Sequence, residues 1–227
     1  MCGRFTLTAT PDEVSRQFGL SESPLLSPRF NIAPCQPIAT ISTAPESARR
    51  VLVRRRWGLI PGWAKDPKIG NRMLNARIET LAEKPAFRAA LRKRRCLVPA
   101  NGFYEWAARP GGAKQPHHIA LPGGICFAIA GLWESWRDPT GASVESCTLL
   151  ATAAIPKLRE VHDRMPVILD PADYAIWLAP GAPDDETLRR LARGAACEAL
   201  ELHPVGRRVN DPRFDDPACL APAGGSG

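Results

Sequence analysis

Short runs of β-forming residues, separated by turns and brief helical patterns, fill most of this 227-residue chain. In each run the apolar residues alternate or cluster over about four to eight positions, which is typical of strands in a half-buried or buried sheet. The strands that this pattern predicts are 38–43, 50–57, 96–99, 117–121, 125–132, 147–152, 165–169 and 200–205. The first two are close neighbours in the chain and are expected to form a hairpin pair.

The clearest helix signal is Thr10-Pro11-Asp12-Glu13, which reads as an N-cap, a proline at N1 and a capping-box glutamate at N3. This helix is predicted to stop at Gly19. Further helices are predicted at 75–82, 85–93, 156–161, 171–178 and 184–193. Irregularly spaced strands with short helices between them favour an α+β fold over a doubly wound sheet. We therefore expect a mainly antiparallel, barrel-like β core with several short flanking helices.

The chain shows no internal repeat and no low-complexity linker, so a single domain over residues 1–217 is expected. Residues 218–227 are expected to be a disordered tail, since chain ends are poorly ordered unless something ties them down. No apolar run approaches the roughly eighteen residues that a membrane helix needs, and the start of the chain does not resemble a secretory signal. A cytoplasmic protein, without membrane attachment, is the expectation.

The formal net charge is +7, and arginine supplies 24 of the 30 basic residues. Planar guanidinium groups suit bidentate recognition of phosphate, so a polyanionic partner is favoured. An abundance of Ala, Arg, Pro and Gly that follows from a GC-rich genome is the alternative explanation. The seven cysteines are scattered and never form C-x-x-C, which argues against a disulfide framework or a zinc site. The pair His117-His118 has no cysteine nearby and is interpreted as strand surface, so no metal is predicted.

Cys2 is the most informative residue, because removal of Met1 would leave an N-terminal cysteine. Such an end group carries an α-amine of pKa about 7.7–8.0 and a thiol of pKa about 8.5 on adjacent carbons. The amine condenses with an aldehyde to an imine, and the neighbouring thiolate adds to the imine carbon to give a five-membered thiazolidine. An internal cysteine cannot perform this chemistry.

Glu105 lies between two aromatic residues just after Asn101-Gly102, a pair expected to form a turn with positive φ. Packing by aromatic rings would remove water from the carboxylate and raise its pKa, which suits a general acid or base. Asn75 and Arg77 are two residues apart, so in an extended segment they would share a face. A surface glutamate and a helix-capping pair are the structural alternatives.

His162 follows a predicted short helix and precedes a strand, a position from which it could project into a cleft. Arg164 is two residues further on, and Arg4 is close to the terminal amine. Trp63 closes a segment rich in tryptophan, proline and glycine, and it is interpreted either as a core residue or as a stacking platform for a base. A purely structural histidine remains the alternative for His162.

Five motifs resemble the SRAP family, the SOS-response-associated peptidase-like proteins that crosslink to abasic sites in single-stranded DNA. In chain order they are Met1–Phe5, Trp57–Pro61, Asn75–Glu79, Cys96–Trp106 and His162–Pro166. The resemblance spans residues 2 to about 170 and continues in Val209-Asn210 with the acidic residues that follow. It implies abasic-site processing through lyase-like imine chemistry, which requires neither a metal nor an organic cofactor.

The resemblance also assigns roles to individual residues. Cys2 would be the nucleophile, Asn75 would orient it and the opened sugar, Glu105 would act as acid and base, and His162 would shuttle protons nearby. The residues that would contact DNA are Arg4, Arg77 and Arg164, through flanking phosphates, and Trp63, through a base. The implied partner is single-stranded DNA with an abasic site, at a single-to-double-strand junction as one setting, bound by a monomer.

Two other functions are compatible with the same residues. Cys2 with His162 and either Asn75 or Glu105 resembles the nucleophilic arrangement of a cysteine peptidase, which could also release Met1 autocatalytically. A non-covalent single-stranded DNA-binding protein, in which Cys2 is incidental, is the remaining alternative.

Overall fold

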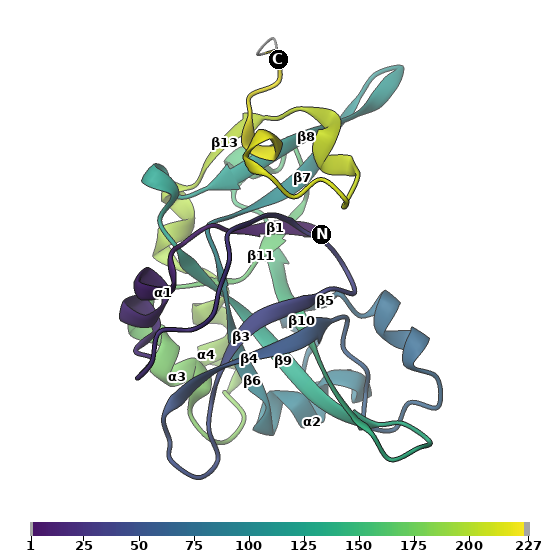
Figure 1. Ribbon diagram of the computed structural model, residues 1–227, viewed down its shortest axis with the longest axis vertical. Helices are drawn as coiled ribbons and strands as arrows, with labels where there is room; N and C mark the ends of the chain where they lie inside the picture. The colour runs from purple at the N-terminus through teal and green to yellow at the C-terminus, as the bar shows by residue number, and fades with distance from the viewer. Residues whose placement is uncertain (1, 225–227) are drawn as a thin grey trace.

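Five strands close into a β-barrel in the computed structural model, which describes residues 2–224 (Figure 1). The barrel strands are β3 (Pro37–Thr43), β4 (Arg50–Trp57), β6 (Arg95–Ala100), β9 (Phe127–Arg137) and β10 (Ser143–Ala153). They follow the order β10-β4-β3-β6-β9, and β9 pairs again with β10, which closes the ring. All of these pairs are antiparallel except the short β4–β10 pair. The α+β fold with a mainly antiparallel, barrel-like core is therefore confirmed.

A second, antiparallel sheet lies beside the barrel, in the upper half of Figure 1. In spatial order its strands are β13 (Glu201–Pro204), β8 (Gly112–Ala120), β7 (Gly102–Arg109), β1 (Arg4–Leu7) and β2 (Arg29–Ile32). Barrel strand β6 continues through Asn101 into β7, so the two sheets are joined by a continuous chain. Three short strands extend the barrel sheet: β5 (Asn75–Arg77), β11 (Arg164–Pro166) and β12 (Ile168–Leu169).

Short helices flank the sheets, as predicted. The α-helices are α1 (Pro11–Phe18), α2 (Pro85–Lys93), α3 (Tyr174–Leu178) and α4 (Asp185–Leu191). The 3-10 helices are η1 (Pro67–Arg72), η2 (Ile78–Thr80), η3 (Pro122–Gly124), η4 (Pro156–Leu158), η5 (Pro171–Asp173), η6 (Ala195–Ala199), η7 (Arg207–Asn210) and η8 (Pro217–Leu220). No helix within residues 2–224 is long and apolar enough to span a membrane.

Helix α1 has the start and the end that its sequence predicts. Thr10 Oγ1 accepts the Glu13 N–H, and the Glu13 carboxylate accepts the Thr10 N–H, so the capping box is complete. Gly19 closes the helix in the left-handed conformation, at φ 66°. The inner face buries Val14 and Phe18.

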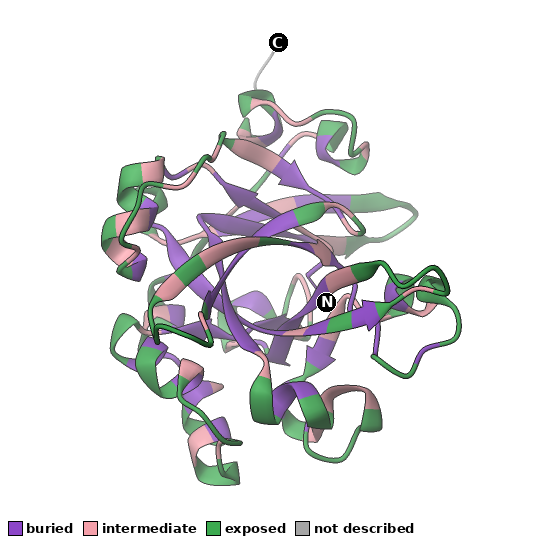
Figure 2. Ribbon diagram, turned by 60° about the horizontal axis from the view of Figure 1, so that its bottom comes forward, coloured by how far each residue is buried: buried purple, intermediate pink, exposed green. Residues whose placement is uncertain are grey.

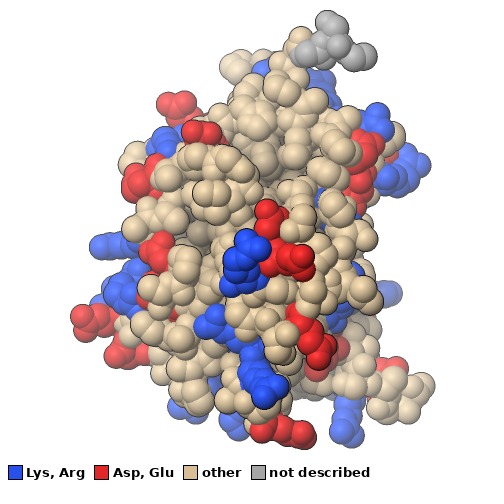
Figure 3. All heavy atoms as spheres, turned by 60° about the vertical axis from the view of Figure 1, so that its left-hand side comes forward, with Lys and Arg blue, Asp and Glu red and all other residues tan. Residues whose placement is uncertain are grey.

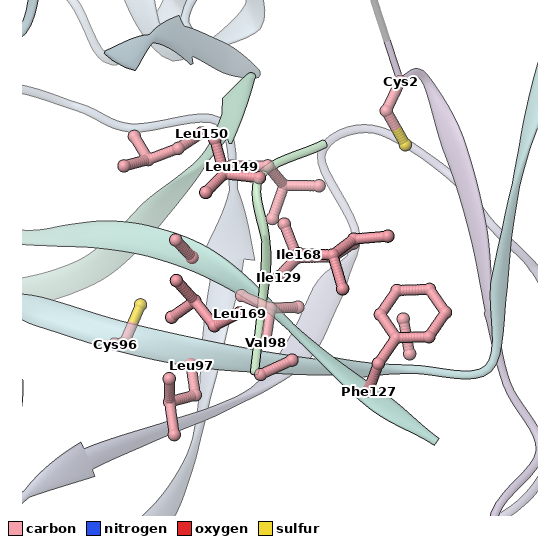
Figure 4. Close-up of a cluster of buried hydrophobic side chains, with 14 of the residues drawn as sticks. Cys2, Cys96, Leu97, Val98, Phe127, Ile129, Leu149, Leu150, Ile168 and Leu169 are labelled. Carbon is pink, nitrogen blue, oxygen red and sulfur yellow. The ribbon is translucent and has the colours of Figure 1, made fainter. Parts of the chain in front are cut away.

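The main hydrophobic core fills the barrel and continues under α1 and the helices after β12. Figure 2 shows that the strands are buried along much of their length, whereas the helices present exposed residues outward. Side chains of β6, β9, β10 and β12 meet in this core, and Figure 4 shows Cys2 at its periphery, on the chain leading into β1. Cys2 and the strand that follows it are therefore part of the packed structure.

The helix predicted at 75–82 is wrong. Residues Asn75–Arg77 form β5, parallel to Leu149–Ala151 of β10, and only the 3-10 turn η2 follows. Pairing with a distant strand overrides the local helical preference here. The turn expected at Asn101-Gly102 is also different, because neither residue has positive φ. Asn101 Oδ1 instead accepts the N–H groups of Thr8 and Ala9.

The tail expected to be disordered from residue 218 is ordered over its first part. Residues Pro217–Leu220 form η8, Cys219 is fully buried, and Pro222 forms a β-bridge with Val205. The segment is held because the Cys219 thiol donates to the Phe214 carbonyl oxygen and the Ala223 N–H donates to the carbonyl oxygen of Pro204 in β13. Residues 225–227 of the expected tail lie outside the described residues.

Substitution Gly102→Ala tests the packing between β7 and β8. A Cβ at position 102 would lie 2.3 Å from His118 Nε2 and 2.9 Å from the Ile119 carbonyl oxygen. We expect the free energy of unfolding to fall by about 1–3 kcal/mol, the usual range for overpacking, in a denaturant titration. Gly112→Ala is the matched control at the start of β8, because its nearest neighbours are 3.9 Å away. Equal stability of the two variants would contradict this account.

Candidate functional site

Cys2 is fully buried immediately before β1. Its thiol donates a hydrogen bond to the Arg4 carbonyl oxygen at 3.4 Å, and its own carbonyl oxygen accepts Nδ2 of Asn75 at 2.8 Å. Burial raises the pKa of the thiol, and the nearby Glu105 carboxylate raises it further. The thiol is therefore held in its protonated form, and Cys2 is hydrogen-bonded through both its side chain and its backbone.

Asn75 reaches Cys2 because β5 lies along β10, with Asn75 opposite Leu149. The side-chain amide is oriented by this contact: Nδ2 donates to Cys2, and Oδ1 is buried with no hydrogen-bond partner in the described chain. A buried amide oxygen without a donor costs free energy unless a ligand supplies one. Asn75 thus presents an acceptor beside the nucleophile predicted from the sequence.

Glu105 is 3% exposed in the middle of β7, directly opposite His117 of β8. Burial raises the pKa of its carboxyl group to about 7, and the Asp163 carboxylate adds to the rise while Lys114 opposes it. The pKa is raised in the predicted direction, but Tyr104 and Trp106 alternate onto the other face of β7, where they pack with Val205 and Val209. Near neutral pH the group exists in both protonation states, as a general acid or base requires.

His162 lies in the turn between η4 and β11, with its side chain 30% exposed. Nδ1 accepts the Arg164 backbone N–H at 2.9 Å, and the Asp163 carboxylate is 3.0 Å from the same atom. The bond from the Arg164 N–H needs an unprotonated Nδ1, whereas an ion pair with Asp163 needs a protonated Nδ1. Asp163 is 87% exposed and solvated, so the backbone bond decides in favour of the neutral ring with Nε2–H. Burial also lowers the pKa of His162, against the pull of Asp163.

The four predicted catalytic residues come from distant parts of the chain but share one neighbourhood. Glu105 acts on the pKa of Cys2, and Asp163, adjacent to His162, acts on that of Glu105. Lys114 of β8 influences both Glu105 and His162. The sequence did not single out Lys114, because nothing in its local pattern distinguishes it from any exposed lysine.

The predicted DNA-contacting residues differ in how the fold uses them. Arg77 and Trp63 are exposed, Trp63 by 62%. Arg164 instead forms a bidentate ion pair with Glu79, at 3.0 and 2.7 Å, and donates to the Ala151 carbonyl oxygen. Arg4 donates to Asn31 and to the backbone near residue 209. A phosphate would have to compete with these bonds at Arg164 and Arg4.

A groove of about 410 Å³ adjoins Trp63 and contains Lys65, Lys68 and Arg72 on its walls. A larger cavity of about 570 Å³ lies between η2, β10 and α4 and includes Glu79, but none of the four predicted catalytic residues lines it. The second cavity is therefore separate from the neighbourhood of Cys2. In the part of the chain that the structure describes, no group of three or more His, Cys, Asp or Glu side chains is placed to hold a metal ion.

The excess of basic residues does not make every face of the protein positive. On the face drawn in Figure 3, Lys and Arg side chains are interspersed with Asp and Glu. Several arginines are also internal: Arg55 and Arg95 are 3% and 7% exposed, and they bind carbonyl, hydroxyl and carboxylate oxygens. Part of the arginine excess therefore serves the fold.

Comparison with known proteins decides the family. The sequence profile described as "SOS response associated peptidase (SRAP)" matches residues 1–212. The chain belongs to the SRAP family. It is 41% identical to abasic site processing protein YoqW of Bacillus subtilis over 223 residues, which covers 97% of this chain and 99% of that protein. It is 32% identical to abasic site processing protein HMCES of Xenopus tropicalis, covering 97% of this chain and 78% of that protein.

Solved structures show the same SRAP fold. A protein from Bordetella bronchiseptica superposes with a TM-score of 0.74 at 28% identity, covering 90% of this chain and all of that one. A protein from Bacteroides thetaiotaomicron has a TM-score of 0.85 at 24% identity, covering 98% of this chain and all of that one. The second likeness concerns the fold alone.

Substitution Glu105→Gln tests the electrostatic state of the site. The folded-state pKa of about 7 exceeds the ordinary 4.5, so the wild-type protein loses stability as pH rises through this window. Glutamine does not ionise. We expect the variant to gain stability relative to wild type between pH 4.5 and 7, by on the order of 3 kcal/mol above pH 7.

Denaturant titrations at pH 4, 6 and 8 measure this difference in unfolding free energy. Glu83→Gln, at an exposed residue, is the control and should show no such trend. A Glu105→Gln difference that is the same at all three pH values would contradict the raised pKa.

Proposed function

We propose that the protein processes abasic sites in single-stranded DNA by forming a covalent thiazolidine between N-terminal Cys2 and the opened deoxyribose. One observation carries the proposal: the buried Cys2 is held by Asn75 and lies within the electrostatic reach of a carboxyl group with a pKa of about 7. The names of the relatives, abasic site processing proteins, point to the same substrate. The adduct would shield the lesion.

Ring opening is the first step, because an abasic sugar is mostly a closed hemiacetal and only its open form carries an aldehyde. Glu105 takes the hydroxyl proton as a carboxylate and returns a proton to the ring oxygen as an acid, which its pKa permits. His162 in its Nε2–H form donates a hydrogen bond to the sugar oxygen. Proton shuttling through His162 requires that Nδ1 give up its bond from the Arg164 N–H.

Adduct formation follows after Met1 has been removed. The α-amine nitrogen attacks the aldehyde carbon, the carbonyl oxygen leaves as water, and an imine results. The Cys2 sulfur then adds to the imine carbon, and the thiol proton passes to the nitrogen. Since the raised pKa keeps the thiol protonated, its proton must leave during the attack, and the Glu105 carboxylate, which acts electrostatically on the thiol, is the proposed carrier to the nitrogen. These reaction steps need no oxidant and release one water molecule.

DNA binding draws on the exposed residues around this site. Arg77 is two residues after Asn75 and is free to meet a phosphate, whereas Arg164 becomes available only if the phosphate displaces Glu79. Trp63 and the cations of its groove suit a base with its flanking phosphates, since aromatic rings and cations together bind single strands. We propose binding as a monomer, with a single-to-double-strand junction as one setting.

Cysteine peptidase chemistry receives less support from the same geometry. A peptidase nucleophile needs a lowered thiol pKa, usually beside a protonated histidine. Here the pKa of Cys2 is raised and that of His162 is lowered. The thiazolidine route tolerates a neutral thiol because the amine attacks first.

An abasic oligonucleotide tests the proposal. Mass spectrometry of the mixture should show an adduct of protein and DNA minus one water, and the adduct should survive heating. Cys2→Ser keeps the amine but lacks the thiol, so its imine should be trapped only when borohydride is added. Protein that retains Met1 should give no heat-stable adduct.

The outcome that rejects the thiazolidine is a heat-stable adduct from Cys2→Ala without reductant. Salt-sensitive DNA binding should persist in Cys2→Ala and Cys2→Ser, because neither change touches the cations. Hydrolysis of an unrelated peptide by the wild type, abolished in His162→Ala, would restore the peptidase alternative.

A further inference from the structure

The segment after the last strand, residues 205–222, crosses the second sheet and is called the C-terminal strap here. It contains η7 and η8, and its two ends meet at the bridge between Val205 and Pro222. Asp215 accepts the N–H groups of Phe30 and Asn31 on β2. The strap is thus bound to the sheet edge that contains β1 and β2.

Asn31 is the centre of this attachment and is fully buried. Its Nδ2 lies within hydrogen-bond distance of the carbonyl oxygens of Val209, Asp211 and Phe214, at 3.1, 3.1 and 2.7 Å. Its Oδ1 accepts Nη1 of Arg4 at 3.1 Å. One side chain therefore fixes the path of the strap and the direction of the Arg4 guanidinium.

The strap holds the strand that carries the thiol. Arg4 Nη1 donates to the Val209 carbonyl oxygen at 2.6 Å, and Nη2 to the Asn210 carbonyl oxygen at 3.4 Å. The Arg4 carbonyl oxygen in turn accepts the Cys2 thiol. The position of Cys2 is thereby linked to residues 209 and 210 through a single intervening residue.

Asn210 of the strap also binds β7, the strand that contains Glu105. Asn210 Oδ1 accepts the indole Nε1–H of Trp106 at 2.8 Å, and Trp106 directly follows Glu105. Around this bond, Trp106 packs against the small cluster of Tyr104, Val205 and Val209. Asn210 therefore bonds to one residue near Cys2 and to another beside Glu105.

This bridge acts where the β1–β7 pairing has ended, although β7 still pairs with β8 at Glu105. The pairing between β1 and β7 runs from Thr6–Gly102 to Arg4–Tyr104 and ends there, so Cys2 and Glu105 lie beyond the last pair. Beyond a ladder's end, the separation of two side chains depends on other contacts. A misplacement of about 1 Å between reacting groups can cost on the order of a hundredfold in rate.

We propose that Asn210 is a positioning residue of the crosslinking reaction, which fixes the separation of Cys2 and Glu105 by binding both of their strands. The inference rests on the proposed function. It gives Arg4 a role in placing Cys2 that is independent of any phosphate contact.

Single-turnover crosslinking rates over a range of abasic-oligonucleotide concentrations test the bridge. Asn210→Ala should lower the maximal rate about tenfold or more and leave the half-saturating DNA concentration unchanged, because no DNA contact is lost. Asn210→Asp keeps an acceptor for the Trp106 indole and should remain within about twofold of wild type. Trp106→Phe should lower the rate as Asn210→Ala does. The double variant should lose little more of the rate, since both changes remove the same hydrogen bond.

Arg208→Ala is the matched control. It removes the ion pair with Asp216 and the stacking on Phe214, both inside the strap, without touching β1 or β7. Its crosslinking rate should equal that of wild type. A wild-type rate in Asn210→Ala, or an equal loss in Arg208→Ala, overturns the inference. Absence of any heat-stable adduct with the wild-type protein rejects the proposed function itself, and the positioning role with it.

Discussion

The hydrogen bond from Asn75 to the Cys2 carbonyl oxygen ties the start of the chain to the closed barrel. Chain ends are usually mobile, and a reactive end group is useful only if it occupies one position. Here the thiol, the carbonyl group and the Arg4 side chain each have a partner in a different part of the fold. The barrel supplies one of them, and the second sheet with its strap supplies the others.

Local signals predicted the elements that depend on local chemistry. Helix α1 follows from Thr10, Glu13 and Gly19 alone, and the β3–β4 hairpin from alternation. The segment 75–82 was mispredicted because its backbone partner, β10, is more than seventy residues away along the chain. The ordered start of the tail was also missed because its partners are distant along the chain. No sequence pattern reports that Cys219 will find a buried place against the second sheet.

The candidate site was predictable mainly through family resemblance. Residue chemistry alone indicated Cys2, Glu105 and His162 as candidate site residues, but a purely structural role remained an alternative for each. Asn31 and Asn210 could not be found this way, because neither a buried asparagine in a short strand nor an exposed one in a 3-10 helix differs from other polar residues until its partners are known. Arginine content likewise overstated the free positive surface. Arg55 and Arg95 donate their hydrogen bonds inside the protein, where the rigid guanidinium group binds several buried oxygens at once.

The contact between Arg4 and Val209 joins residues 205 positions apart. During synthesis on the ribosome, the Arg4 side chain cannot make this contact until almost the whole polypeptide has been made. If Met1 is removed, as the proposed function requires, an aminopeptidase can reach it before the strap attaches to the strand that follows Cys2. Late closure of the fold would then separate two events in time: trimming of the nascent end, and attachment of the strap that fixes Arg4.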